Sequence, residues 1–81
     1  MKFALTARAL RDYRALRPPL QRTADKQLGL LLKSLRHPSL NAKKYDRAND
    51  VWQARVSRSH RFYFRIEGDT YVILAIISHP K

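Results

Sequence analysis

Arginine and tyrosine side chains recur at every second position in two neighbouring segments of the chain. Arg55 lies near the end of the first segment, and Arg61, Tyr63 and Arg65 lie in the second. If the segments are adjacent strands joined by the short turn at 58–60, all four side chains share one sheet face, because successive strand residues point to opposite faces. Neighbouring arginines repel, so their concentration suggests a polyanion that relieves the repulsion. A merely solvated, aggregation-resistant face is the alternative.

Further cationic and aromatic side chains flank these segments. They come from the polar stretch before the first segment and from the end of the chain, and we predict that they rim the same surface: Lys43, Lys44, Tyr45, His79 and Lys81. Lysines at such a rim can bind a phosphate backbone, and exposed aromatic rings can stack on unpaired bases. Trp52 is predicted to belong to the core instead.

The overall charge favours nucleic acid as a partner. The chain has 17 lysine and arginine residues against 6 aspartate and glutamate residues, a net charge of +11, and eleven of the cations are arginine. Such a field attracts polyanions, and the planar guanidinium fork matches phosphate oxygens. The alternative for any single surface arginine is that it only keeps a small protein soluble.

Length and composition limit the other possibilities. Eighty-one residues predict one domain over 1–81, and 44% hydrophobic residues are ordinary for a globular chain. The absence of cysteine excludes disulfides, a thiolate nucleophile and a cysteine-rich zinc site, which fits a reducing compartment. No apolar run approaches the roughly 20 residues needed to span a bilayer. We therefore expect a cytoplasmic protein without a membrane partner.

The first half of the chain shows helical periodicity. Lys2–Leu5 is a possible short strand, and Thr6 is a suitable N-cap for an amphipathic helix over Ala7–Leu16. Pro18 and Pro19 end that helix and open a second one, whose apolar residues recur at three- and four-residue spacing from Leu20 to Leu35. Gly29, inside this helix, indicates either a close neighbour or a suboptimal position.

The second half shows a period of two. Ser39–Asp50 is polar and is expected to be a loop. Strands are predicted at Val51–Ser57, Arg61–Glu67 and Thr70–Ile77, and the last should be central because it is apolar on both faces. The order β-α-α-β-β-β predicts an α+β domain in which a helical hairpin packs on one face of a largely antiparallel sheet.

Five motifs, in this order and spacing, resemble the RelE/ParE superfamily of small bacterial toxins, most closely its RelE-like members. The motifs are RHPSL at 36–40, KKY at 43–45, VWQARV at 51–56, HRFYF at 60–64 and SHPK at 78–81. The resemblance covers nearly the whole chain. It implies a RelE-like fold and a toxin that cleaves mRNA in the ribosomal decoding site while a neighbouring antitoxin holds it in check.

RNA cleavage through the substrate's own 2′-hydroxyl needs neither metal nor cofactor, and none is predicted. The protein must move two protons and neutralise charge on the phosphate. By resemblance and geometry, Arg61 is the first candidate for charge neutralisation and Arg55 the second. His79 is the first candidate for proton transfer and His60 the reserve. His60 is also expected to bind RNA on the arginine surface, with Tyr63 and Arg65. The arginine-rich segment and terminal tyrosine of many RelE-like proteins have no counterpart before Lys81, so the general base stays open.

Other readings of the resemblance remain open. Some relatives inhibit DNA gyrase without cutting RNA, so a ParE-like gyrase inhibitor is the alternative, and a relative that binds RNA without catalysis is a third possibility. Under both toxin readings we expect an acidic, partly disordered antitoxin that folds onto the basic domain, in an assembly that can be a heterotetramer. Under the first reading the ribosome and mRNA are partners as well.

Overall fold

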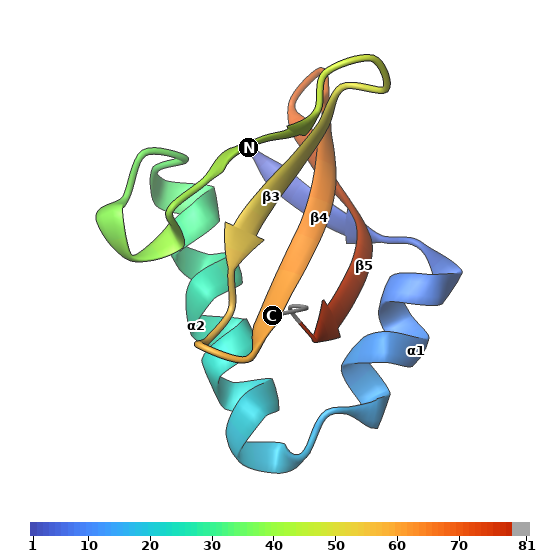
Figure 1. Cartoon of the computed structure of the whole chain (residues 1–81), viewed down its shortest axis with the longest axis vertical. Coiled ribbons are helices and arrows are strands. Elements are labelled where there is room, and N and C mark those ends of the chain that lie inside the picture. Colours follow the sequence, from blue (N-terminus) through green and yellow to red (C-terminus); the bar gives the residue numbers. More distant parts are fainter. Residues whose placement is uncertain (79–81) are drawn as a thin grey trace.

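The computed structural model describes residues 1–78, in which a five-stranded sheet carries two helices (Figure 1). The elements in chain order are β1 (Lys2–Leu5), α1 (Ala7–Ala15), α2 (Pro18–Lys33), the 3₁₀ turn η1 (Pro38–Leu40), β2 (Lys43–Asp46), β3 (Val51–Arg55), β4 (His60–Glu67) and β5 (Thr70–Ser78). In this part of the chain, no helix is long and apolar enough to cross a bilayer.

The strands lie in the order β1-β5-β4-β3-β2, with β1 parallel to β5 and all other neighbours antiparallel. The predicted α+β class, with helices on a largely antiparallel sheet, is confirmed. The central strand is β4, whereas β5 lies between β4 and β1. Because β5 has a strand on each side and helices over one face, its apolar composition still fits an interior strand.

The polar stretch before β3 was predicted as a loop, and this prediction is wrong. It contains η1 and the edge strand β2, so the chain has one strand more than the predicted order. β2 pairs only with β3. An edge strand buries little, and charged side chains there also discourage pairing with other chains. Its residues therefore lack the apolar alternation by which an interior strand is recognised.

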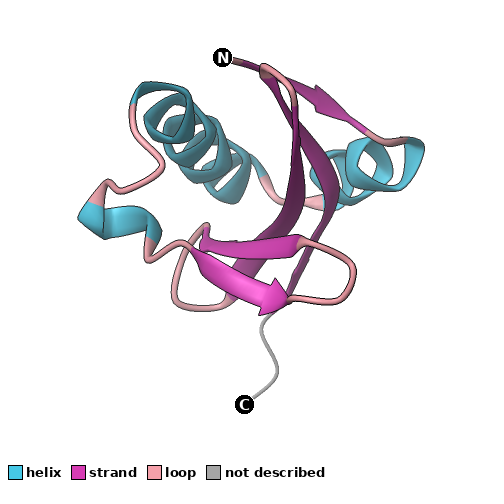
Figure 2. Ribbon diagram, turned by 90° about the horizontal axis from the view of Figure 1, so that it is seen from above, coloured by secondary structure: helices cyan, strands magenta, loops and turns pink. Residues whose placement is uncertain are grey.

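Helix α2 covers one face of the sheet and α1 lies beside the edge of β5 (Figure 2), and the boundaries of both helices follow local signals. The Thr6 hydroxyl accepts a hydrogen bond from the backbone N–H of Ala9, 3.1 Å away, and so caps α1 as predicted. Pro18 and Pro19 occupy the first turn of α2, where a missing N–H costs nothing. The core between helices and sheet includes the fully buried side chains of Leu31, Leu40, Phe62, Phe64 and Ile73.

Helix α1 also covers the edge of β5 that β1 leaves open. β1 pairs with β5 only as far as Ile73. Beyond that point the Thr6 hydroxyl donates to the carbonyl of Leu74 at 3.1 Å, and the Asp12 carboxylate accepts from the N–H of Ile76 at 3.0 Å. These two side chains satisfy backbone groups that an edge strand would expose. They fix α1 beside the carboxyl-terminal half of β5.

Candidate functional site

The sheet face opposite α2, called the outer face below, carries the predicted arginines. In the register of β3 and β4, Arg55 lies directly opposite Arg61, and Gln53 lies opposite Tyr63. Arg65 follows two residues beyond Tyr63 on β4 and so points to the same face. The prediction that Arg55, Arg61, Tyr63 and Arg65 share one face is therefore confirmed by the strand register.

The guanidinium of Arg61 is held in place by the turn that precedes it. Its Nη1 donates to the carbonyl oxygens of Ser57, at 2.6 Å, and His60, at 3.0 Å. The side chain is half-buried, whereas Arg55 is exposed. Within residues 1–78 the ion pairs are Arg8 with Asp12 and Lys44 with Asp50, so no carboxylate of this part of the chain neutralises the two arginines. Opposed like charges on neighbouring strands destabilise a sheet and leave donors free for an anion.

Strand β2 separates the two predicted lysines. Lys43 lies opposite Gln53 and shares the outer face. Lys44 lies opposite Trp52 on the helix side, where its Nζ is 5.3 Å from the centre of the indole ring and pairs with Asp50. The expectation that Lys44 rims the outer face is therefore wrong. The reason is the alternation of a strand, which the predicted loop did not impose.

His60 does not lie on the outer face. His60 begins β4 on the helix side, where it lines a hollow with Leu16 and Pro19, and its Nδ1 is 2.8 Å from the hydroxyl of Ser59. The prediction that it joins the arginine surface is thus incorrect, again because of strand alternation. His79 and Lys81 lie outside the described residues.

Two tyrosines form an aromatic corner on the outer face. The ring centres of Tyr45 and Tyr63 are 4.9 Å apart, with an interplanar angle of 66°. Tyr63 is only 9% exposed, and its hydroxyl accepts a hydrogen bond of 3.1 Å from Nε2 of Gln53. Tyr45 is 63% exposed. One ring is thus fixed in the sheet, and the other presents its surface to solvent.

A hollow of about 280 Å³ opens beside this corner. It is lined by Arg8, Tyr45, Val51, Tyr63, Ala75 and Ile77. Arg8, on α1, was not among the predicted site residues. The position of Arg8 depends on the hydrogen bond between Asp12 and Ile76, which are 64 residues apart. A local sequence pattern does not predict such a contact.

Asp46 is the last residue of β2, and its carboxylate faces the turn that leads to β3. The side-chain amide of Asn49 donates to it at 2.8 Å and the backbone N–H of Asn49 at 3.2 Å. These hydrogen bonds, with a smaller contribution from the charge of Arg65, hold the pKa of Asp46 below its usual value. A carboxylate stabilised in this way is a weak base, so Asp46 is better suited to fixing the turn than to proton transfer.

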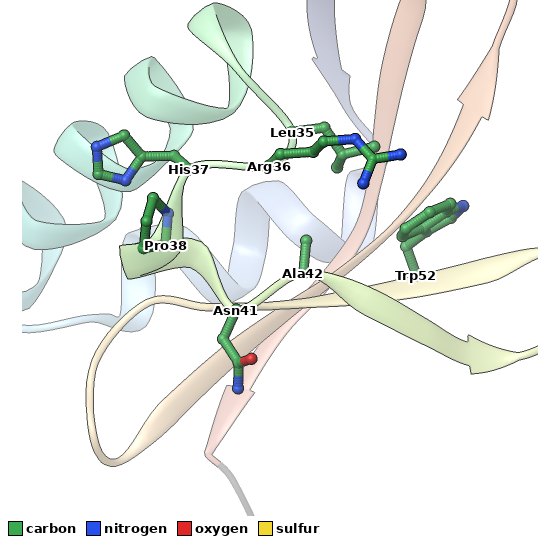
Figure 3. A pocket seen from close by; sticks show the side chains of 7 residues that line it. All are labelled: Leu35, Arg36, His37, Pro38, Asn41, Ala42 and Trp52. Atoms are coloured by element: carbon green, nitrogen blue, oxygen red, sulfur yellow. The ribbon is translucent and has the colours of Figure 1, made fainter.

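A third hollow, of about 330 Å³, lies on the helix side beyond the end of α2 (Figure 3). Figure 3 shows the side chain of Arg36 extending toward Trp52, whereas the ring of His37 points away from both. Nδ1 of His37 accepts the backbone N–H of Ser39 at 3.2 Å, which caps η1. This histidine therefore has a structural role at the start of η1.

Comparisons with known proteins give a family and a fold. A family model described as the ParE toxin of the type II toxin-antitoxin system parDE matches residues 3–81. The YoeB/ParE toxin from Agrobacterium tumefaciens has a similar structure, with a TM-score of 0.82, 15% identity, and 99% of this chain and 100% of that chain covered. The toxin-antitoxin complex RelBE2 from Mycobacterium tuberculosis has a TM-score of 0.79 and 23% sequence identity, with 96% of each chain covered.

The intact E. coli RelBE toxin-antitoxin complex gives a TM-score of 0.74 at 17% identity, with 98% of this chain and 96% of that chain covered. Curated protein sequences give no match. At these identities the structural likenesses establish the fold alone, whereas the family model spans nearly the whole chain.

Proposed function

The chain belongs to the ParE toxin family of type II toxin-antitoxin systems, and from this premise we propose that it cleaves messenger RNA on the ribosome, with its outer face against the RNA. The family match confirms the superfamily to which the sequence motifs pointed. The observation that carries the proposal is the pair Arg55 and Arg61, opposed across β3 and β4 without a carboxylate partner in residues 1–78.

The proposed reaction uses the 2′-hydroxyl of the RNA as nucleophile. This oxygen gives up its proton to a base and forms a bond to the adjacent phosphorus, so that a 2′,3′-cyclic phosphate results; the bond to the 5′ oxygen of the next nucleotide breaks, and that oxygen takes up a proton. Negative charge grows on the non-bridging oxygens in the transition state. Arg61, already oriented by Ser57 and His60, and Arg55 opposite it would donate to those oxygens. Lys43 would hold an adjacent phosphate.

The residue that transfers protons in the proposed reaction is assigned from the sequence alone. His79 stays the predicted group, and it lies outside the described residues. The hydroxyl of Tyr63 accepts from Gln53 and keeps its own proton, so Tyr63 can donate a hydrogen bond to the substrate.

The proposed partners follow from charge and from the similar structures. Several of those structures are complexes of a toxin with its antitoxin, which supports an antitoxin for this chain as well. We expect an acidic segment, because the toxin carries a net charge of +11. The toxin would then act in the cytoplasm, where its ribosomes are.

Inhibition of DNA gyrase is the second candidate, because the resemblance implies that activity for ParE-like relatives and the matching family model describes ParE toxins. The two activities have different effects on protein synthesis, DNA synthesis and transcripts. A ribosome-dependent nuclease stops protein synthesis first and cuts transcripts, whereas a gyrase inhibitor stops DNA synthesis first and leaves transcripts whole.

The deciding experiment is induced expression from a tightly repressed promoter, with pulse labelling of protein by methionine and of DNA by thymidine. The proposal expects methionine incorporation to fail first, and cleaved mRNA to appear in a reconstituted translation reaction. Replacing Arg55 and Arg61 by alanine should lower the cleavage rate about 10²- to 10³-fold each, as for other fixed donors to a transition-state anion.

The matched control is Arg22→Ala, which removes the same charge from an exposed site on α2. It should cleave like the parent, and the melting temperature of every variant identifies any that fail to fold. Early failure of thymidine incorporation with intact transcripts would reject the nuclease and support gyrase.

A further inference from the structure

The hollow beside Tyr45 and Tyr63 differs from the arginine pair in chemistry. Its floor and walls are apolar or aromatic, from Val51, Ala75, Ile77 and the two tyrosine rings, and its one cationic lining residue is Arg8. Its volume of about 280 Å³ is slightly below the range of pockets for drug-sized ligands, so it suits a single planar group. A phosphate group would make no stacking contact with the aromatic walls.

The hollow also lies next to the arginine pair on the same sheet face. Tyr63 is two residues from Arg61 on β4, and its partner Gln53 is two residues from Arg55 on β3. Two strand residues span about 7 Å. An anionic ligand held by the arginines would therefore extend directly over the aromatic corner.

Arg8 is held at the rim by a chain of contacts. Its Nε lies 3.5 Å from Oδ2 of Asp12, and the same oxygen accepts the backbone N–H of Ile76. Within residues 1–78 its terminal nitrogens have no hydrogen-bond partner, and its side chain is 60% exposed. These donors are therefore available to a polar edge of a group that enters the hollow.

We propose that this hollow receives one unstacked nucleobase of single-stranded RNA, which stacks on Tyr45 and is bounded by Tyr63, while Arg8 donates to its polar edge. The inference rests on the proposed RNA-contacting role of the outer face. A base joined to phosphates matches the combination of an aromatic hollow and adjacent unpaired guanidinium groups. A protein side chain could fill the hollow but would not need the arginine pair.

The test uses the full-length toxin and a fluorescently labelled 2′-O-methyl heptanucleotide, which lacks the nucleophilic hydroxyl and so reports binding without cleavage. Seven further oligonucleotides each carry one abasic site, and anisotropy gives the dissociation constants at low salt. The parent protein should lose about 5- to 150-fold in affinity for one abasic position, the range found when a single base stack is removed.

Variants connect that position to the hollow. Tyr45→Ala should weaken the intact oligonucleotide by a similar factor and should become insensitive to that abasic site, whereas Tyr45→Phe, which keeps the ring, should behave like the parent. Arg8→Gln should weaken binding at the same position. Arg11→Gln, an equal charge change at an exposed site on the same helix, should not.

The outcomes separate this inference from the proposed function. Tight binding that is equally insensitive to every abasic site, or unchanged sensitivity in Tyr45→Ala, overturns the base subsite and leaves the RNA-contacting face intact. Absence of salt-dependent binding to any oligonucleotide also overturns the base subsite, whereas the proposed function stands or falls with the cleavage of mRNA in the reconstituted translation reaction.

Discussion

Gln27, buried on α2, donates a hydrogen bond of 2.9 Å to the carbonyl oxygen of Arg55, the last residue of β3. The same amide nitrogen donates to the carbonyl of Ser39 at 3.1 Å. One side chain thus ties the helix to the strand end that carries the first arginine of the outer face. The position of Arg55 depends on the core side of the sheet as well as on strand pairing.

We therefore predict that Gln27→Leu lowers the free energy of unfolding by about 1–3 kcal/mol, because two carbonyl groups lose their donor in a buried setting. For a domain of this size the melting temperature should fall by about 4–8 °C per kcal/mol. Thermal unfolding followed by circular dichroism measures this effect. Lys26→Leu, at an exposed neighbouring position, is the control, and equal melting temperatures for the two variants would contradict the assigned role.

Replacement of the two glycines of the chain by alanine should change the stability of the fold in opposite directions. A methyl group built on Gly29 meets no atom within 4 Å, so the position is suboptimal rather than closely packed. Gly29→Ala should stabilise α2 by about 1 kcal/mol.

Gly68, between β4 and β5, has φ of 60°, and alanine at this position should lower the free energy of unfolding by about 1–2 kcal/mol. Urea denaturation of both variants tests the pair, and destabilisation by Gly29→Ala would show that the helix needs glycine for another reason.

The arginine pair was predictable because the side-chain period of a strand is a local property. Residues 51–57 and 61–67 alternate clearly, and the short turn between them leaves little choice of register. The predicted N-cap at Thr6 and the helix break before Pro18 rest on equally local signals, and both agree with the structure.

The remaining parts of the site depend on contacts between distant segments. β2 has polar residues on both faces, so only its pairing with β3 reveals it as a strand. That pairing in turn assigns Lys43 and Lys44 to opposite faces. Arg8 reaches the outer face because Asp12 bonds to Ile76 across 64 residues, and helical periodicity alone indicates only that Arg8 is exposed.

The contact between the helices predicts a pH dependence at alkaline pH. The Tyr13 hydroxyl donates to the carboxylate of Asp25 at 2.8 Å, and this hydrogen bond raises the pKa of Tyr13 above its ordinary value of 10.0. A raised pKa of an acid means that folding favours its protonated form. The stabilisation is therefore fully present below pH 10 and is lost as the pH rises through the raised pKa.

Tyr13→Phe removes the donor and should remove this dependence. The melting temperatures of parent and variant should differ below pH 10 and converge as the pH rises through the raised pKa of Tyr13, which thermal scans between pH 8 and pH 11.5 would show. A difference that stays constant over this range would mean that the hydrogen bond contributes nothing to stability.

The opposed arginines predict that polyanions stabilise the fold. A ligand that binds only the native state at 100 times its dissociation constant adds about 2.7 kcal/mol to the free energy of unfolding. A 2′-O-methyl oligonucleotide should therefore raise the melting temperature of the parent at low salt, and added salt should abolish the rise. The double variant Arg55→Ala, Arg61→Ala should show a much smaller rise, whereas Arg22→Ala should match the parent.

Without a polyanion the two arginines should respond differently to replacement. Arg55→Thr relieves a cross-strand repulsion and should raise the free energy of unfolding by about 0.2–1 kcal/mol. Arg61→Ala relieves the same repulsion but also loses the hydrogen bonds to Ser57 and His60, so it should be less stable than Arg55→Thr. Denaturant titrations at several salt concentrations distinguish the charge repulsion from the hydrogen bonds, because salt screens the repulsion and leaves the hydrogen bonds unchanged. If Arg55→Thr destabilises the protein at every salt concentration, the two guanidinium groups do not repel each other in the folded state.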